Sequence, residues 1–287
     1  MSHKNSSVHK RIEIGVLSFL SNLKPEQFSS TFNFFNKLVK KYPITTAVQT
    51  TANQMTLLKV TDEHSQLYIS HPQRLRLYRN GITPRLDHLL AQYQLADIDF
   101  AVDDLIIDCG ANIGEFTRGL QNRHNVAAIS IEPDDLEIAA LELNTNKDKT
   151  HVYQTLLWNK TESVPFHQAN VTGDSSIFGS DKNTEQHQRP ATTLNELLAK
   201  DTLYQAKGRI KLLKLEAEGA EPEILEGADN ILSSVEYITA DCGPERGPAH
   251  ENTIIAVWRQ LAKHGFTPII FDHTRTVLVC KNTRLVK

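Results

Sequence analysis

The chain has 287 residues, of which 40% are hydrophobic and 23% are charged, and its formal net charge is −3. This composition is typical of a globular protein with a sizeable core, and the slightly acidic balance argues against broad attraction to nucleic acid or membranes. No uncharged apolar run is long enough to span a bilayer, and residues 1–10 lack the apolar stretch of a signal peptide. We therefore expect a cytoplasmic protein.

Three cysteines, Cys109, Cys242 and Cys280, are too few and too scattered for a disulfide framework. We interpret them as reduced, partly buried thiols. The spacing of cysteines and histidines gives no zinc pattern, so no metal is indicated, although the clustered acids further along the chain do not exclude Mg²⁺.

Residues 1–96 are predicted to form an N-terminal helical or mixed extension. Apolar spacing predicts helices over 8–23, 26–42 and 84–94, with short strands near 56–60 and 67–70. Pro25 and Pro43 end the first two helices. Phe28, Phe32 and Phe35 share one face of the second helix, where we expect them to be buried in a lid, in a dimer contact or in ordinary core.

Residues 97–287 show alternating strand and helix patterns. Strands are expected at 105–107, 127–131, 152–158, 210–215, 237–240, 268–271 and 277–280, and helices at 114–121, 134–144, 192–200, 222–232 and 253–264. A long polar loop is expected from 159 to 189. Such alternation predicts a doubly wound α/β domain, and the closing hairpin adds an antiparallel last strand. This is the Rossmann-like, seven-stranded shape of class I methyltransferases.

The stretch 105–117 is the most informative part of the chain. A buried strand ends at Asp108, and a loop containing Gly110 and Gly114 leads into a helix. Small ligands bind at such strand ends, and the acid and the Gly-x-x-x-Gly spacing disfavour a dinucleotide and hence a nicotinamide oxidoreductase. A cation such as S-adenosylmethionine fits Asp108, and Asn112 is placed to bond its carboxylate. The alternative is a tight turn without a ligand.

Two later strand ends offer further contacts for this cofactor. Glu132 and Pro133 close the second strand, where an acid accepts hydrogen bonds from ribose hydroxyls. The alternative for Glu132 is an acid that favours the next helix dipole. Trp158 and Asn159 close the expected third strand, where stacking on adenine and a hydrogen bond to its edge compete with core packing of the tryptophan.

Acids gather where the fourth and fifth strands end. Glu216, Glu218 and Glu221 follow or end the fourth strand, and such acids are costly unless something charged binds them. Glu218 is placed as a general base and Glu216 at the site end of the sheet, with a structural salt bridge as the alternative for both. Glu221 favours the next helix dipole. Asp241 ends the fifth strand.

Three further segments are weaker candidates for contacts with the substrate. Tyr78 and Arg85 precede the first strand, Ser175 and Ser176 lie in the long polar loop, and Arg246 follows the fifth strand. The segment with Tyr78 and Arg85 would cover the cofactor, and the loop with the two serines would close over the cofactor or substrate. The guanidinium of Arg246 would hold a phosphate or carboxylate of the acceptor. The alternative for each is an ordinary surface position.

Several ordered motifs resemble the FkbM family of S-adenosylmethionine-dependent methyltransferases. The matching stretches are 107–114, 132–133, 193–198, 214–221 and 224–228. The resemblance implies that the cofactor is bound by Asp108, Gly110, Asn112, Gly114 and Glu132. It also places Glu218 in the acidic motif and an acid such as Asp241 at the fifth strand end. Glu216 departs from the family, which usually has Asp there.

The resemblance implies methyl transfer to a hydroxyl, and we expect the acceptor to be a sugar of a surface polysaccharide or glycolipid precursor. A polyketide or other secondary metabolite is the alternative acceptor, and a non-catalytic nucleotide-binding protein is the reading from another class. A base must take the hydroxyl proton during attack, which we assign first to Glu218 and then to Asp241 or a loop histidine. Besides the acceptor, the N-terminal helices suggest a second copy of the chain as a partner, and no nucleic acid is expected.

Overall fold

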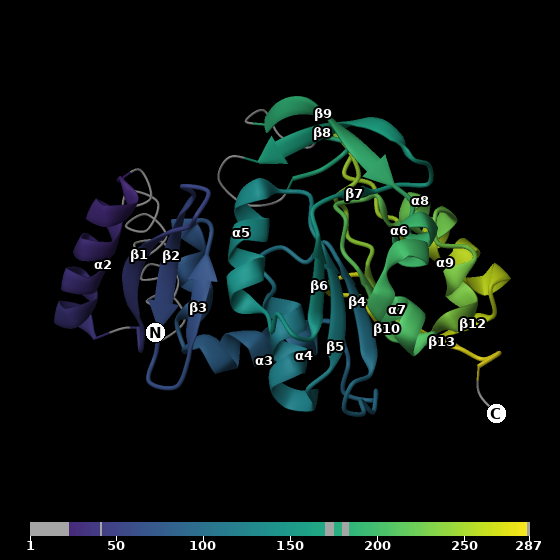
Figure 1. The fold of residues 1–287 in the computed structure, drawn as a ribbon, viewed down its shortest axis with the longest axis horizontal. Helices are drawn as coiled ribbons and strands as arrows, with labels where there is room; N and C mark the ends of the chain where they lie inside the picture. Colours follow the sequence, from purple (N-terminus) through teal and green to yellow (C-terminus); the bar gives the residue numbers. More distant parts are fainter. Residues whose placement is uncertain (1–22, 41, 170–174, 180–183, 286–287) are drawn as a thin grey trace, which may run out of the picture. The chain divides into compact units, whose positions relative to one another are not determined.

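The structure is a computed structural model that describes residues 23–40, 42–169, 175–179 and 184–285 (Figure 1). The chain divides into two compact units, Met1–Leu86 and Asp87–Lys287, and the division falls inside α3 (Ile82–Gln92). The expected boundary between residues 96 and 97 stays a prediction. The helix expected over 8–23 lies outside the described residues except for its last one.

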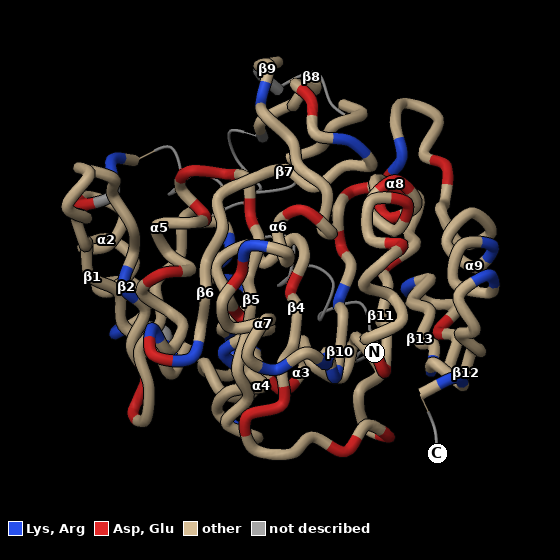
Figure 2. Tube along the Cα trace, turned by 45° about the vertical axis from the view of Figure 1, so that its right-hand side comes forward, with Lys and Arg blue, Asp and Glu red and all other residues tan. Residues whose placement is uncertain are grey.

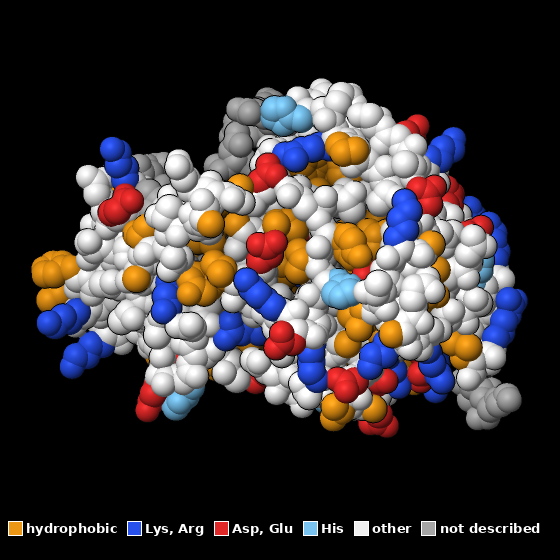
Figure 3. Space-filling view, in the orientation of Figure 1, with side chains coloured by type: hydrophobic (Ala, Val, Ile, Leu, Met, Phe, Trp, Pro, Cys, Tyr) orange, Lys and Arg blue, Asp and Glu red, His pale blue; other side chains and the backbone are white. Residues whose placement is uncertain are grey.

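The N-terminal unit packs α2 (Pro25–Val39) on an antiparallel sheet of β1 (Thr45–Thr50), β2 (Thr56–Thr61) and β3 (Gln66–Ile69), followed by η1 (Pro72–Tyr78). Lys40 ends α2 earlier than expected, since it takes a left-handed φ of 48°. Phe28 and Phe32 are buried in this unit, whereas Phe35 is 44% exposed in the single chain, so it is not part of the core and its burial in a dimer contact stays a prediction. Apolar side chains are visible over α2 in Figure 3.

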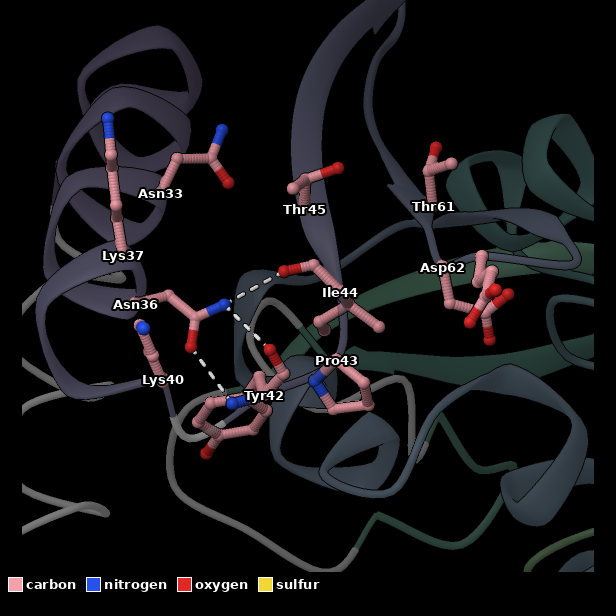
Figure 4. A pocket seen from close by; sticks show the side chains of 11 residues that line it. Asn33, Asn36, Lys37, Lys40, Tyr42, Pro43, Ile44, Thr45, Thr61 and Asp62 are labelled. Atoms are coloured by element: carbon pink, nitrogen blue, oxygen red, sulfur yellow. Dashed lines mark hydrogen bonds between the residues drawn. The ribbon is translucent and has the colours of Figure 1, made fainter.

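A hollow in this unit lies beside α2 and the start of β1 (Figure 4). Asn36 donates to the carbonyl oxygens of Tyr42 and Ile44 and accepts from the Tyr42 N–H, each at 2.9 Å. Asn33 makes the same kind of pair with the backbone of Thr46, at 2.6 and 2.8 Å. These two amides therefore fasten the helix to the strand. The residues that line the hollow include none of the site residues expected from the sequence.

The second unit contains a seven-stranded sheet in the order β12-β13-β11-β10-β4-β5-β6. Its strands are β4 (Leu105–Cys109), β5 (Ala127–Ile131), β6 (Thr150–Tyr153), β10 (Ile210–Leu215), β11 (Val235–Asp241), β12 (Phe266–Asp272) and β13 (Val277–Asn282). Neighbouring strands are parallel except at β13, which runs antiparallel to both β11 and β12. The expected class I methyltransferase fold with its antiparallel last strand is confirmed.

Helices cover both faces of this sheet (Figure 1). One face carries the end of α3, α4 (Glu115–His124) and α5 (Asp135–Asn144), and the other carries α6 (Leu194–Lys200), α7 (Thr202–Lys207), α8 (Glu221–Glu226) and α9 (Ile254–Lys263). The short η2 (Ile231–Ser234) adds buried residues to the core on this second face. Successive strand residues face opposite layers, so Ile106 packs with Leu90 and Leu120 of α3 and α4, whereas Ile107 belongs to the core under α6, α8 and α9. Asp108, two residues beyond Ile106, therefore faces the α4 side.

The long polar loop expected over 159–189 is wrong. β8 (Glu162–Ala169) and β9 (Thr184–Thr192) pair antiparallel, and β7 (Leu156–Leu157) adds to β9 in parallel. The expected third strand over 152–158 is also wrong at its end, because β6 stops at Tyr153. Val164 and Phe166 are buried in β8, and β9 offers little apolar alternation, which hides this small sheet in the sequence.

Candidate active site

The carboxyl ends of β4, β5, β10 and β11 meet at one edge of the sheet, and the loops that follow them form the candidate active site. In Figure 2, acidic segments gather around the start of α8, shortly after β10. The expected cofactor and catalytic residues at this edge are Asp108, Gly110, Asn112, Gly114, Glu132, Pro133, Glu216, Glu218 and Asp241. Trp158 and Asn159 follow β7 instead.

Asp108 is fully buried, and its partners belong to the chain itself. The parallel register places it beside Lys214 of β10, whose Nζ lies 3.1 Å from Asp108 Oδ1. Thr117 Oγ1 of α4 donates to the other carboxylate oxygen at 2.9 Å. The cation that this strand-end acid requires is thus an internal lysine. A direct contact between Asp108 and the cofactor stays a prediction.

Lys214 also holds the loop after β4. Its Nζ donates to the carbonyl oxygens of Gly110 and Cys109 at 2.6 and 3.3 Å. Burial by itself would lower the pKa of Lys214, but the carboxylates of Asp108 and Glu216 outweigh it and hold that pKa above its usual range. Lys214 lies in one of the motifs that resemble the FkbM family, but the motif alone gives it no role.

The two glycines of the loop after β4 are required by the backbone conformation and by close contacts with the rest of the chain. Gly110 has a φ of 71°, and a Cβ there would lie 1.8 Å from the Glu216 carbonyl oxygen. Gly114 has a φ of 82°, and a Cβ there would lie 2.6 Å from Leu141 Cδ1 of α5. Both positions exclude a side chain for reasons of conformation and space. Their approach to a ligand stays a prediction.

Glu132 joins the end of β5 to the loop after β4. Its Oε2 accepts the Asn112 N–H at 2.8 Å, and its Oε1 accepts the Asp134 N–H at 3.0 Å, across Pro133. The side chain is 7% exposed, and no lysine or arginine within the described residues pairs with it. Burial raises the pKa of Glu132 to about 8. Asp134 caps α5 through the Leu136 N–H, so it serves the helix start.

Trp158 and Asn159 contact other parts of the small sheet and α8. The Trp158 ring lies 6.0 Å from that of Phe178, and the backbone N–H of Trp158 donates to the Thr192 carbonyl at 2.9 Å. Asn159 Nδ2 donates to Glu226 Oε2 at 3.0 Å. These contacts agree with the packing alternative for Trp158, and a role with adenine stays a prediction.

A row of alternating charges continues along the sheet edge from Lys214. Glu216 lies 3.1 Å from Lys214 Nζ and 3.9 Å from Arg275 Nη2, and Arg275 Nη2 lies 2.7 Å from Asp241 Oδ2. Burial would raise the pKa of Glu216, but the charge of Lys214 and the side-chain hydrogen bonds that Glu216 accepts lower this pKa overall. Burial raises the pKa of Asp241 despite its bond to Arg275. The turn between β12 and β13 supplies Arg275, which the sequence analysis missed because no local pattern links it to these acids.

Glu218 lies in the loop between β10 and α8, with a left-handed φ of 51°. Glu221 braces this loop, since its carboxylate accepts the N–H groups of Ala217 and Gly219 at 2.8 and 3.2 Å and the Thr253 hydroxyl at 3.0 Å. Glu221 is therefore more than an acid that favours the helix dipole. The loop that carries Glu218 is therefore held in place by hydrogen bonds to the Glu221 carboxylate.

Ser175 and Ser176 contact the loops at this edge. Ser176 Oγ donates to the Glu218 carbonyl at 3.1 Å, and Ser175 Oγ lies 3.3 Å from Asp134 Oδ2. Part of the expected closing loop, residues 173 and 174, lies outside the described residues. A contact between these serines and the acceptor stays a prediction.

Arg246 makes a two-pronged ion pair with Glu223, at 2.9 and 2.7 Å, and donates to the Gly219 carbonyl at 2.8 Å. It thereby fastens the loop after β11 to the loop after β10. Tyr78 and Arg85 belong to the N-terminal unit, where Tyr78 is fully buried. Acceptor binding by these three residues stays a prediction.

Glu245, after β11, is a further carboxylate at this edge that the sequence analysis did not single out. Burial, together with the carboxylates of Asp241 and Glu216, raises the pKa of Glu245 to about 8. In the part of the chain that the structure describes, its carboxylate has no hydrogen bond or ion pair. An acid between Pro244 and Arg246 was the only signal in the sequence. Among the described residues, no group of three or more His, Cys, Asp or Glu side chains is arranged to hold a metal ion.

Residues 108–268, more than half of the chain, match the family described as the methyltransferase FkbM domain. The chain belongs to this family. The 2-O-methyltransferase NoeI of Sinorhizobium fredii is 24% identical over 186 residues, which cover 60% of this chain and 76% of that relative. The match excludes the oxidoreductase reading, and this FkbM enzyme is a methyltransferase that depends on S-adenosylmethionine.

Solved methyltransferases are more distantly similar to this FkbM chain. A SAM-dependent methyltransferase from Aquifex aeolicus has a TM-score of 0.40 and 10% identity, covering 74% of this chain and 92% of the other. M. capricolum TrmK in complex with S-adenosyl-homocysteine has a TM-score of 0.36 and 10% identity, covering 69% and 68%. The fold assignment rests on the strand order of the chain itself.

The residues of the FkbM site fit this cofactor. Each Glu132 oxygen accepts one N–H group and keeps a second lone pair for a ribose hydroxyl. Along the charged row, three carboxylates, of Asp108, Glu216 and Asp241, face two cations, Lys214 and Arg275, and this excess of acid suits a cationic ligand.

Proposed function

We propose that this enzyme transfers the methyl group to a hydroxyl oxygen of a sugar in a surface polysaccharide or glycolipid precursor. The observation that carries the proposal is the set of carboxylates at the site edge, because a sugar hydroxyl needs a base during attack. The two candidate bases among them are Glu218, in the loop after β10, and Glu245, after β11. The name of the relative NoeI supports oxygen as the acceptor atom, and the family resemblance supports a sugar.

S-adenosylmethionine supplies the electrophilic methyl group when it is bound. Glu132 and the loop after β4 orient it, and Glu218 takes the proton of the attacking hydroxyl. Glu216 and Asp241 are weaker bases for this step because Lys214 and Arg275 compensate their charge. Glu245 is the second candidate base, since a carboxyl with a pKa of about 8 is matched to proton transfer near neutral pH.

The identity of the base is tested by comparing the Glu218→Gln and Glu245→Gln variants with Glu142→Gln, a control that removes an exposed acid from α5. We expect Glu218→Gln to lower kcat on the order of a hundredfold with little change in the cofactor KM. If Glu245 is the base instead, the wild-type rate rises up to about pH 8 and this rise disappears in Glu245→Gln. An unchanged rate in both variants contradicts carboxylate base catalysis at this edge.

The acceptor is tested by incubating the full chain and S-adenosylmethionine with sugars, glycan precursors and polyketide hydroxyls, and measuring methyl addition by mass spectrometry. Methylation of a sugar hydroxyl supports the proposal. Methylation of polyketides alone supports the alternative acceptor, and binding of S-adenosylhomocysteine without turnover on any hydroxyl supports the non-catalytic reading.

We further propose a cytoplasmic location. The three cysteines are free and buried, which agrees with a reducing compartment. No helix within the described residues is long and apolar enough to cross a bilayer. A homodimer stays a prediction.

A further inference from the structure

Lys214 is a buried cation at the point where the cofactor loop leaves the sheet. Only 2% of its side chain is exposed, and the rings of Tyr93 and Phe116 lie 5.5 and 5.8 Å from its Nζ. The carboxylates of Asp108 and Glu216 each lie 3.1 Å from that nitrogen. This ammonium is enclosed by protein groups and cannot serve as a surface charge.

The same nitrogen is bonded to the backbone of the loop. It donates to the Gly110 carbonyl at 2.6 Å and lies 3.3 Å from the Cys109 carbonyl. The N–H groups of Gly110 and Ala111 both reach the Ile131 carbonyl at 3.0 Å. The peptide groups at the start of the loop are therefore fixed on both sides, by Lys214 through the carbonyls and by β5 through the N–H groups.

We propose that Lys214 is a positioning residue for the cofactor, which holds the Cys109–Gly110 backbone in the conformation that binds S-adenosylmethionine. It acts through the loop and does not touch the reacting atoms. The energetic reason is that hydrogen bonds from a charged donor are stronger than neutral ones, and that the low-polarity surroundings strengthen them further. The proposal concerns the cofactor and is independent of the acceptor under "Proposed function".

A simple loss of stability must be separated from this role. Removing Lys214 alone leaves Asp108 as a buried, uncompensated charge, which is strongly destabilising by itself. Removing both charges of a buried pair is far better tolerated. The informative variant is therefore Lys214→Met combined with Asp108→Asn, in which Glu216 keeps Arg275 as a partner. It is compared with Asp108→Asn alone, because Asp108 is itself an expected contact of the cofactor, and only the further loss of affinity in the double variant counts for Lys214.

Lys211 provides the matched control on the same strand. Its Nζ lies 3.2 Å from Glu236 and 5.2 Å from the ring of Tyr237, and its side chain is 15% exposed. Lys211→Met thus removes a lysine with a carboxylate partner and a ring contact from β10 without touching the cofactor loop.

The test measures S-adenosylhomocysteine affinity by calorimetry and the unfolding midpoint by circular dichroism in each full-length variant. We expect the double variant to unfold within a few degrees of Lys211→Met, while its Kd for S-adenosylhomocysteine rises about tenfold or more. Lys211→Met should bind like the wild type. In turnover assays of the double variant, the cofactor KM should rise more than the acceptor KM.

A folded double variant that binds S-adenosylhomocysteine as tightly as the wild type overturns the proposal. A double variant that does not fold also overturns it, because Lys214 then serves the fold as a whole. Equal loss of affinity in Lys211→Met does so as well, since any weakened β10 would then have the same effect. Failure to methylate sugars leaves the result unaffected, because binding is measured without an acceptor.

Discussion

Asp108 and Glu132 stand at the ends of the neighbouring strands β4 and β5, and both are buried, but the chain treats them differently. Asp108 meets the ammonium of Lys214 at 3.1 Å. Within the described residues, Glu132 meets two backbone N–H groups and no cation, and burial raises its pKa to about 8. The ammonium of Lys214 compensates the charge of Asp108, whereas the Glu132 carboxylate can still accept hydrogen bonds from a ligand. Burial alone therefore does not say which strand-end acid serves a cofactor.

The largest expected effect comes from Gly110→Ala, which tests how closely the loop after β4, next to Asp108, packs against the chain. In Gly110→Ala the new methyl would meet the Glu216 carbonyl at 1.8 Å, so we expect loss of cofactor binding and of much of the fold. Gly208→Ala is the control, because its φ of 65° is similar and no atom lies within 4 Å of the added Cβ. That control should lose only about 1 kcal/mol in urea unfolding. Equal losses in the two variants would show that conformation, and not close approach, makes Gly110 necessary.

Asp108→Ala tests the paired acid itself. It leaves Lys214 buried with one carboxylate fewer, and we expect the free energy of unfolding to fall by about 3–5 kcal/mol. Asp87→Ala breaks the exposed ion pair with Arg123, at 2.6 Å, and should cost less than about 1 kcal/mol. Urea unfolding at neutral pH measures both. A small loss at Asp108 would mean that Lys214 is satisfied without it.

Glu132→Gln tests the unpaired acid through pH. A carboxyl whose folded pKa is raised, here from 4.5 to about 8, contributes stability that is full below about pH 4.5 and is lost as the pH rises through about 8. The loss is on the order of 5 kcal/mol, and the variant should lack this slope. Urea unfolding of both proteins between pH 4 and pH 9 measures it. Parallel pH profiles would show that Glu132 is already ionised in the folded chain.

The smallest expected effect concerns binding. Ribose hydroxyls that donate to Glu132 favour its ionised form, so the affinity for S-adenosylhomocysteine should rise on the order of tenfold from pH 6 to pH 8 and level off above about 8. In Glu132→Gln the affinity should be lower and independent of pH. Calorimetry over this range gives both curves. A falling affinity in the wild type would assign the ribose to another group.

The strands of the large sheet were predictable because their apolar runs are strong, as in 105–107 and 210–215. The small sheet was not, because β9 carries little apolar alternation to reveal a buried face. The end of the third strand was misplaced for a related reason. Leu156 and Leu157 follow β6 after only two residues but pair with β9, and only tertiary structure separates the two strands.

The positions of the site residues were more predictable than their partners. The sequence placed acids at strand ends because parallel strands bring those ends together. It did not predict Lys214 beside Asp108, because that contact depends on the register of two strands about a hundred residues apart. Arg275 was missed for the same reason, since it reaches Asp241 only through the β12–β13 hairpin. The sequence pattern therefore could not predict which cations of distant segments compensate the charges of these acids.

The difference between the two strand-end acids is tested most directly by a ¹³C NMR titration of the Glu132 side-chain carboxyl, assigned by comparison with Glu132→Gln. We predict a midpoint near pH 8 in the free protein, which moves to lower pH when S-adenosylhomocysteine is added. A carboxyl that is already ionised at pH 6, or a midpoint that the ligand leaves unchanged, would contradict the assignment of Glu132 as the acid reserved for the cofactor.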